Sequence, residues 1–125
     1  MGIANFLNGV DFVRKTYLKE TTILSVFDFN NEEKIYIARL LFGICYSDQT
    51  YRFVANQRVI TSKIKSQNNR EFITNSGNCY VSENEPSEFD LSLSEFIVMR
   101  HYVFSPIEIM EARTLFDKNN DLQLH

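Results

Sequence analysis

The chain has 125 residues, of which 44% are hydrophobic and 23% are charged, and these values are typical of a soluble globular domain. Its formal net charge of -3 argues against a protein that depends on nucleic acid, because non-specific affinity for phosphates comes from an excess of Lys and Arg. The longest apolar run, residues 35–46, contains Arg39 and is far shorter than the roughly 20 residues of a membrane-spanning helix.

The first predicted element is an amphipathic helix over residues 3–18. Its apolar residues recur at spacings of three and four, which places them on one face of a helix. They are Ile3, Phe6, Leu7, Val10, Val13, Tyr17 and Leu18. A break near Asn8 and Gly9 is compatible with this pattern, because Gly weakens helices.

A β-hairpin is predicted next. Residues 21–29 are rich in β-branched and aromatic residues, and a polar loop over residues 30–33 separates them from a second apolar run over residues 34–46. That second run has two interpretations. Asn31 could cap a helix, but residues 35–37 and 44–46 favour a strand, so we expect the hairpin.

Three further strands are predicted between residues 58 and 81. Asn68 and Asn69 form a plausible two-residue turn, because Asn tolerates the left-handed conformation that tight hairpins require, and Ser76 and Gly77 offer a second turn. These turns would place Ile64 opposite Ile73, and Ile73 opposite Tyr80. The expected result is an apolar row across one buried face of a sheet.

Two short helices are predicted after a polar loop over residues 84–90. Ser92 with Glu95, and Ser105 with Glu108, have the spacing of capping boxes, and Pro106 suits the first position of the second helix. We expect the second helix to end at residues 119–120 and residues 120–125 to be flexible.

These elements predict an α+β fold in a single domain over residues 1–125. Its expected core is an antiparallel β-meander of four to six strands, with the N-terminal helix and the two C-terminal helices packed on it. The N-terminal residues lack the pattern of a secretion signal, and Cys45 and Cys79 form no CxxC pair. We therefore expect a cytoplasmic protein whose two cysteines are buried as small hydrophobic residues.

The strongest pattern in the sequence is a reversal of charge near Glu71. Residues 49–70 contain five cations and no carboxylate, whereas residues 71–99 contain six carboxylates and neither Lys nor Arg. Separated charge of this kind steers partners during association. The cations are Arg52, Arg58, Lys63, Lys65 and Arg70, and the carboxylates are Glu71, Glu83, Glu85, Glu88, Asp90 and Glu95.

No residue pattern indicates catalysis. His101 has no metal ligand or base at helical spacing, His125 is the terminal residue, and the four glycines form no phosphate-binding motif. We therefore predict no catalytic residue, no metal and no cofactor, although an enzyme assembled from scattered residues stays an alternative.

A protein-binding function fits these features best. The predicted docking surface is the acidic loop, which could also be an ordinary solvated loop. Its residues are Glu83, Glu85, Glu88 and Asp90. A compact acidic domain with such a patch could occlude the basic active site of a nuclease, as the immunity proteins of bacterial toxin systems do. The hypothesis is an immunity or antitoxin-type protein that neutralises a cognate toxin.

The alternative is a small nucleic-acid-binding or regulatory protein that uses a basic and aromatic face of the sheet. Lys63 and Lys65 would share that face with Phe72, opposite Ile64. The full set of candidate residues is Arg52, Arg58, Lys63, Lys65, Arg70 and Phe72. The same face could instead pair internally with the acidic loop, and the chain contains no RNP motif.

Overall fold

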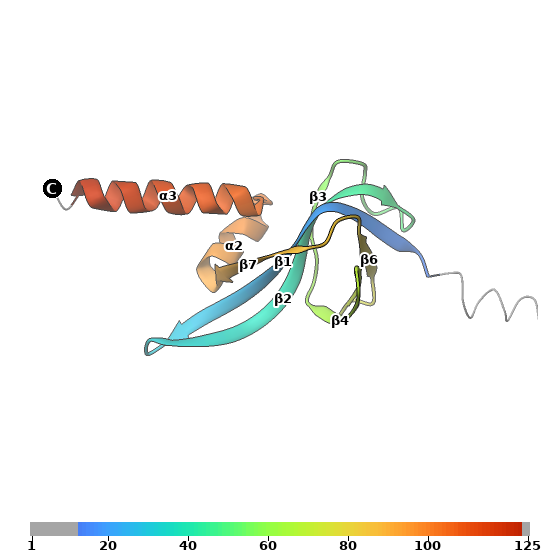
Figure 1. Ribbon diagram of the computed structural model, residues 1–125, viewed down its shortest axis with the longest axis horizontal. Helices are drawn as coiled ribbons and strands as arrows, with labels where there is room; N and C mark the ends of the chain where they lie inside the picture. The colour runs from blue at the N-terminus through green and yellow to red at the C-terminus, as the bar shows by residue number, and fades with distance from the viewer. Residues whose placement is uncertain (1–12, 124–125) are drawn as a thin grey trace, which may run out of the picture.

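The computed structural model describes residues 13–123 and has an α+β fold, a seven-stranded mixed sheet followed by two helices (Figure 1). The strands are β1 (Lys15–Asn30), β2 (Glu33–Asp48), β3 (Arg58–Ile60), β4 (Ile64–Asn68), β5 (Glu71–Thr74), β6 (Cys79–Ser82) and β7 (Ser87–Ser92). The helices are α2 (Leu93–Tyr102) and α3 (Pro106–Gln123).

The predicted N-terminal helix is wrong for residues 13–18, and residues 3–12 lie outside the described part of the chain. Residues 15–18 are the first residues of β1. They pair with β6 on one side, from Lys15 opposite Cys79 to Leu18 opposite Ser82, and with the end of β2 on the other. Hydrogen bonds to distant strands therefore outweigh the local helical spacing.

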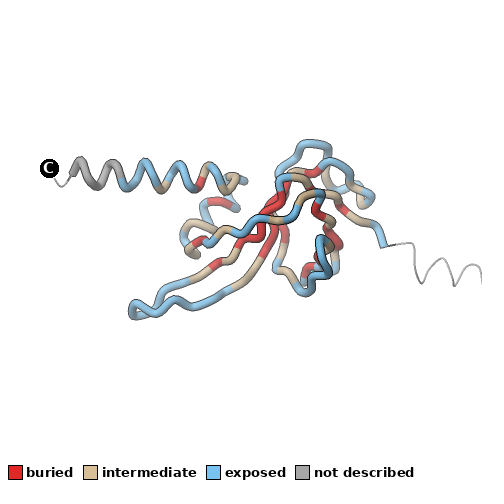
Figure 2. Tube along the Cα trace, in the orientation of Figure 1, coloured by how far each residue is buried: buried red, intermediate tan, exposed pale blue. Residues whose placement is uncertain are grey.

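The predicted hairpin is confirmed, and the helical alternative for residues 34–46 is wrong. β1 and β2 have 16 residues each and pair along their length, with Asn31 and Glu32 at the turn in the left-handed conformation (φ 53° and 69°). Three register shifts interrupt the pairing. Figure 2 shows that the inner half of this hairpin is buried, whereas its end extends into solvent.

The predicted antiparallel meander of four to six strands is wrong, because the sheet has seven strands, and β6 and β7 both lie parallel to β1. The strand order is β3-β2-β1-β6-β5-β4, and β7 pairs with β1 beyond the end of β6. The predicted polar loop over residues 84–90 is therefore wrong for its second half, since Ser87 already belongs to β7. Parallel pairing joins segments far apart in the sequence, and no local pattern predicts it.

The predicted apolar row of Ile64, Ile73 and Tyr80 is also wrong. Ile73 lies opposite Ser66, two residues from its predicted partner Ile64, and Phe72 lies opposite Tyr80, which shifts the pairing of β5 with β6 by one residue. A shift of one residue exchanges the two faces of a strand. Phe72 and Tyr80 are consequently buried, whereas Ile73 is 41% exposed.

Two apolar clusters pack against opposite faces of the β1–β2 hairpin. Successive strand residues point to opposite faces, so Ile23 and Leu41 belong to one cluster, and Leu24 and Phe42 belong to the other. The first cluster also contains Leu18, Cys45, Val59, Phe72 and Tyr80, and the second contains Leu91, Met99 and Ile109. The second cluster attaches the helices to the sheet.

Both predicted capping boxes are confirmed. The Ser92 Oγ accepts from the Glu95 N–H at 3.1 Å while the Glu95 carboxylate accepts from the Ser92 N–H at 2.9 Å. Ser105 and Glu108 make the same two hydrogen bonds at 3.2 and 2.9 Å. The predicted end of α3 at residues 119–120 is wrong, because the helix continues to Gln123; residues 124–125 lie outside the described part.

Asp48 holds the connection between β2 and β3 in place. Its carboxylate accepts from the Thr16 and Thr50 hydroxyls at 2.8 and 2.6 Å. It also accepts from the backbone N–H groups of Thr50, Arg52 and Phe53 at 2.7 to 2.9 Å. Partial burial alone would raise the pKa of Asp48, but these hydrogen bonds outweigh burial and hold the pKa well below its usual range.

We predict that Asp48→Ala lowers the free energy of unfolding by about 2–3 kcal/mol, because several donors lose a charged acceptor. A carboxylate whose pKa is depressed by folding stabilises the protein above the pKa of the unfolded chain, about 4, and this contribution is lost as the pH falls below it. The wild type should therefore lose more stability between pH 7 and pH 3 than Asp48→Asn. Urea unfolding at both pH values measures this difference, and equal losses would contradict it.

Candidate functional site

Hydrogen bonds anchor the acidic segment, defined by Glu83, Glu85, Glu88 and Asp90, along the edge of β1. The Asn84 amide accepts from the Thr21 N–H at 2.9 Å and donates to the Thr21 carbonyl at 3.2 Å. Here β1 has an irregularity between Lys19 and Thr22, with Glu20 in the left-handed conformation (φ 52°). β7 then continues the segment along β1 from Thr22 opposite Ser87. The carboxylates are therefore displayed from an ordered strand and its anchored approach.

Local cations neutralise part of the acidic segment. Glu85 lies 3.5 Å from Arg70, and Asp90 lies 3.6 Å from Lys34. Both pairs are exposed, so each holds its charges together only weakly. Glu83 and Glu88 are exposed and make no ion pair with any residue in the described part of the chain.

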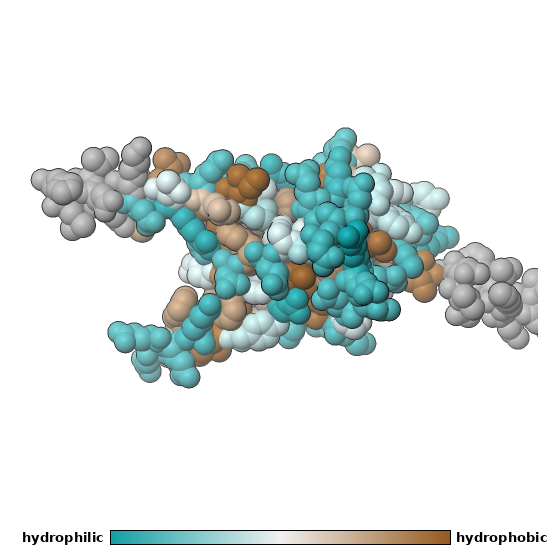
Figure 3. Space-filling view, viewed as in Figure 1, coloured by the Kyte–Doolittle hydropathy of each residue, from teal (hydrophilic) through white to brown (hydrophobic). Residues whose placement is uncertain are grey.

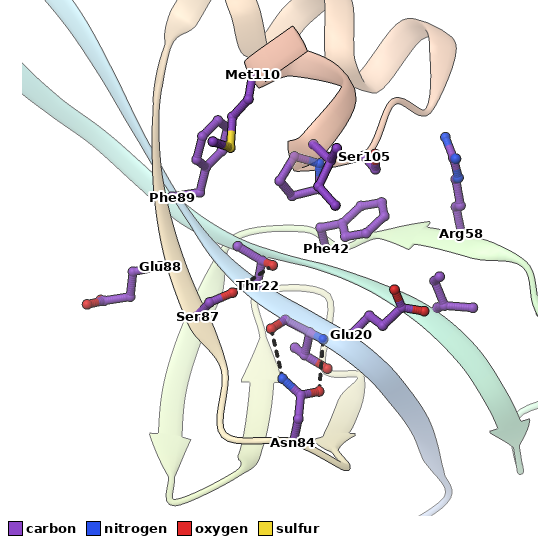
Figure 4. Close-up of a pocket in the computed structure, with 14 residues that line it drawn as sticks. Glu20, Thr22, Phe42, Arg58, Asn84, Ser87, Glu88, Phe89, Ser105 and Met110 are labelled. Carbon is purple, nitrogen blue, oxygen red and sulfur yellow. Dashed lines mark hydrogen bonds between the residues drawn. The ribbon is translucent and has the colours of Figure 1, made fainter.

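A pocket of about 590 Å³ lies beside the acidic segment, between β1, β7 and the first turn of α3 (Figure 4). Phe42, Phe89 and Met110 contribute apolar walls. The hydroxyls of Thr22 and Ser87, 3.1 Å apart, add a polar strip. Its other lining residues are Glu20, Thr21, Ile44, Arg58, Asn84, Glu88, Ser105, Pro106 and Ile107.

The carboxylates of this pocket lie at its rim. In Figure 4, Glu88 lies on one side of the pocket and extends away from Phe42, and Glu20 lies on the other side of the pocket. An apolar hollow with carboxylates at its edge can accept the aliphatic stem of a Lys or Arg side chain while the charged end stays near the rim. Sequence reasoning missed the pocket, because Glu20, Phe42 and Met110 come from distant parts of the chain.

Arg113 connects α3 to the outer edge of β7. Its guanidinium donates to both Glu95 carboxylate oxygens, at 2.5 and 2.7 Å, and to the Asp90 carbonyl at 2.8 Å. The Arg113 contact lowers the pKa of Glu95. The Asp90 carbonyl would otherwise be an open hydrogen-bond acceptor at a sheet edge, so Arg113 helps to protect this edge from unwanted pairing.

Three cations of the predicted nucleic-acid face make contacts within the protein. Arg52 donates to the Tyr80 hydroxyl at 3.3 Å and lies 4.7 Å from the centre of the Phe53 ring. Arg58 pairs with Glu108, and Arg70 pairs with Glu85. Lys63 and Lys65 are exposed and have no ion pair among the described residues.

The predicted placement of Phe72 beside Lys63 and Lys65 is wrong. Phe72 is fully buried in the first apolar cluster, because Gln67 and not Lys65 lies opposite it on β4, and the buried Tyr80 lies opposite it on β6. A buried ring cannot stack on a nucleotide base. The structure therefore does not bring the six candidate residues together on one exposed basic and aromatic surface.

The cysteines are free and buried, as predicted. The Cys79 thiol donates to the Glu71 carboxylate at 3.3 Å, and burial together with this contact raises the pKa of Cys79 to about 11. A thiol with this pKa is protonated at neutral pH and is a poor nucleophile. His101 is exposed and lies edge-on to Tyr102, with ring centres 4.6 Å apart. Within residues 13–123, no group of three His, Cys, Asp or Glu side chains could hold a metal ion.

Neither helix in the described part of the chain is long and apolar enough to cross a membrane. No protein-family model, curated protein or solved structure matches the chain. The function must therefore be argued from the geometry of the surface itself.

We predict that Arg113→Lys lowers the free energy of unfolding by about 1 kcal/mol, because Lys keeps the charge but cannot make the paired contact with Glu95. Arg113→Ala should cost more, about 2 kcal/mol, because the Asp90 carbonyl also loses its donor. Lys65→Ala is the matched control and should leave stability unchanged. Thermal unfolding measures all three, and a Lys variant as stable as the wild type would contradict the paired contact.

Proposed function

We propose that this chain is a non-catalytic protein-binding module of the immunity or antitoxin type, which binds and neutralises a cognate toxin in the bacterial cytoplasm. The observation that carries the proposal is the rigid acidic segment next to an apolar pocket. Asn84 fixes the approach to β7, and Glu83 and Glu88 stay exposed without an ion pair in the described residues. Preorganised charge of this kind accelerates capture without a large ordering cost on binding.

The partner that fits this surface is a toxin with a basic active site, most simply a nuclease. Its Lys and Arg side chains, which must face phosphates, would instead face Glu83 and Glu88. One cationic side chain could enter the pocket, with its stem against Phe42 and Phe89. Binding there would occlude the active site and therefore neutralise the toxin.

We predict that the double reversal Glu83→Lys with Glu88→Lys slows association with the cognate nuclease domain by at least about tenfold at low salt. The salt dependence of the association rate should also decrease. Glu32→Lys with Glu33→Lys is the matched control, since it makes the same change in net charge at the far end of the hairpin. Stopped-flow binding compares the two. Equal slowing by both variants would mean that only net charge matters, and that the acidic segment is not the docking site.

The alternative, nucleic-acid binding, depends on Lys63 and Lys65, since these two cations are exposed and free of ion pairs among the described residues. It predicts retention of single-stranded RNA or DNA at low salt, and loss of retention in Lys63→Glu with Lys65→Glu. The immunity proposal predicts that the wild type retains neither. A filter-binding measurement with a polyuridine and a polythymidine probe decides between them.

A further inference from the structure

Two arms extend from the body of the protein in the same direction (Figure 1). The hairpin arm consists of residues 27–37 at the end of β1 and β2, and the helix arm consists of α3 from residue 112 onward. Both carry large apolar side chains that the rest of the described protein leaves partly exposed. Their exposed fractions are 59% for Phe29, 39% for Ile35, 53% for Tyr36, 41% for Ile37, 62% for Leu115 and 65% for Phe116.

A cleft separates the arms. It consists of two adjoining hollows of about 290 and 820 Å³, which share Ser92, Glu95 and Arg113. Phe27 and Phe29 line the hollow on the hairpin side. Val98, Ile109 and Phe116 line the hollow on the helix side. Figure 3 shows the opening between the arms, with hydrophobic surface on both sides.

The helix arm lacks the contacts that normally stabilise a helix. Among the described side chains of α3, Ile109 is the one that is buried, and the described side chains after Arg113 are exposed. Isolated helices of this length are marginal in water, and most helical stability in proteins comes from packing of an apolar face. Phe116 continues the stripe that begins at Ile109, at a spacing of seven residues, so the arm has an apolar face available for packing.

We propose that the cleft and arms bind a second copy of this chain, with α3 of each copy packed along the cleft of the other. The molecule carries both an apolar cleft and an arm with an exposed apolar face, which is the self-complementarity that a two-fold interface requires. Phe29, Tyr36 and Phe116 expose roughly 350 Å² on the cleft side of each copy, and Val98, which lines the cleft and is 44% exposed, adds to this area. The apolar part of a homodimer interface of standard size is about 65% of roughly 800 Å² per partner, so these side chains would supply most of it.

Charge favours a second copy over the basic partner proposed for the acidic segment. The cleft is lined by Lys34, Asp90, Glu95, Arg113 and Asp117. Four of these charges already form pairs across the cleft floor, Lys34 with Asp90 and Arg113 with Glu95. These pairs leave little net charge in the cleft to attract a strongly charged protein. Packing of the apolar face of another α3 does not depend on such charge.

Sedimentation velocity over a concentration series tests the proposal. We expect the wild type to dimerise in about the micromolar range, and Phe29→Glu or Phe116→Glu to weaken the dimer by at least about tenfold. Val54→Glu is the matched control, because Val54 is 71% exposed in the loop between β2 and β3. A wild type that stays monomeric would overturn the proposal, as would a dimer that is insensitive to both arm variants or equally sensitive to Val54→Glu.

Disulfide trapping tests the contact itself without requiring a disruptive variant. Phe29→Cys and Phe116→Cys proteins are mixed and oxidised, and a mixed covalent dimer is expected because α3 of one copy lies along the hairpin arm of the other. Cys45 and Cys79 are buried and should not react. As the control, Tyr51→Cys is used in place of Phe29→Cys in one mixture and in place of Phe116→Cys in another, because Tyr51 is 87% exposed. Mixed dimers no more abundant than with this control would overturn the proposed geometry.

Discussion

The fold depends on β1, because this strand must pair with several other strands. One edge of β1 pairs with β2 along its length, and the other edge pairs first with β6 and then with β7. Between the end of β6 and the start of β7, this edge of β1 has no strand beside it. Asn84 supplies a donor and an acceptor to Thr21 at that point, so the backbone of β1 keeps its hydrogen bonds where the ladder is interrupted.

The surfaces with functional interest follow from this arrangement. Because β1 and β2 pair with each other along their length, they can be long enough to bury one half in two apolar clusters and to project the other half into solvent. Because β7 lies against β1 and leads directly into α2, the acidic segment and the helices have fixed positions relative to the hairpin. Arg113 then joins α3 to the same edge. Two adjoining surfaces result, one anionic and one apolar, and Asp90 belongs to both.

Local signals in the sequence predicted local structure well. The hairpin over residues 21–46 and the capping boxes at Ser92 and Ser105 rest on neighbouring residues, and both are confirmed. Non-local features were not predictable. The parallel pairing of residues 15–18 leaves no local pattern. The pairing of β5 with β6 is shifted by one residue from the one that Ser76 and Gly77 suggest, which buries Phe72 in place of Ile73. Of the site, the sequence identified the carboxylates, whereas the pocket and the Arg113 contact required the tertiary structure.

The pairing of β1 with β7 has a consequence for biosynthesis. Thr22 and Ser87 are 65 residues apart in the chain. On the ribosome, the hairpin of β1 and β2 can form early, but one edge of β1 stays open until residues 79–92 have emerged. Such long-range pairing folds slowly, and an open edge invites contact with other nascent chains. Chaperone demand during translation is therefore expected to depend on how soon residues 79–92 leave the exit tunnel.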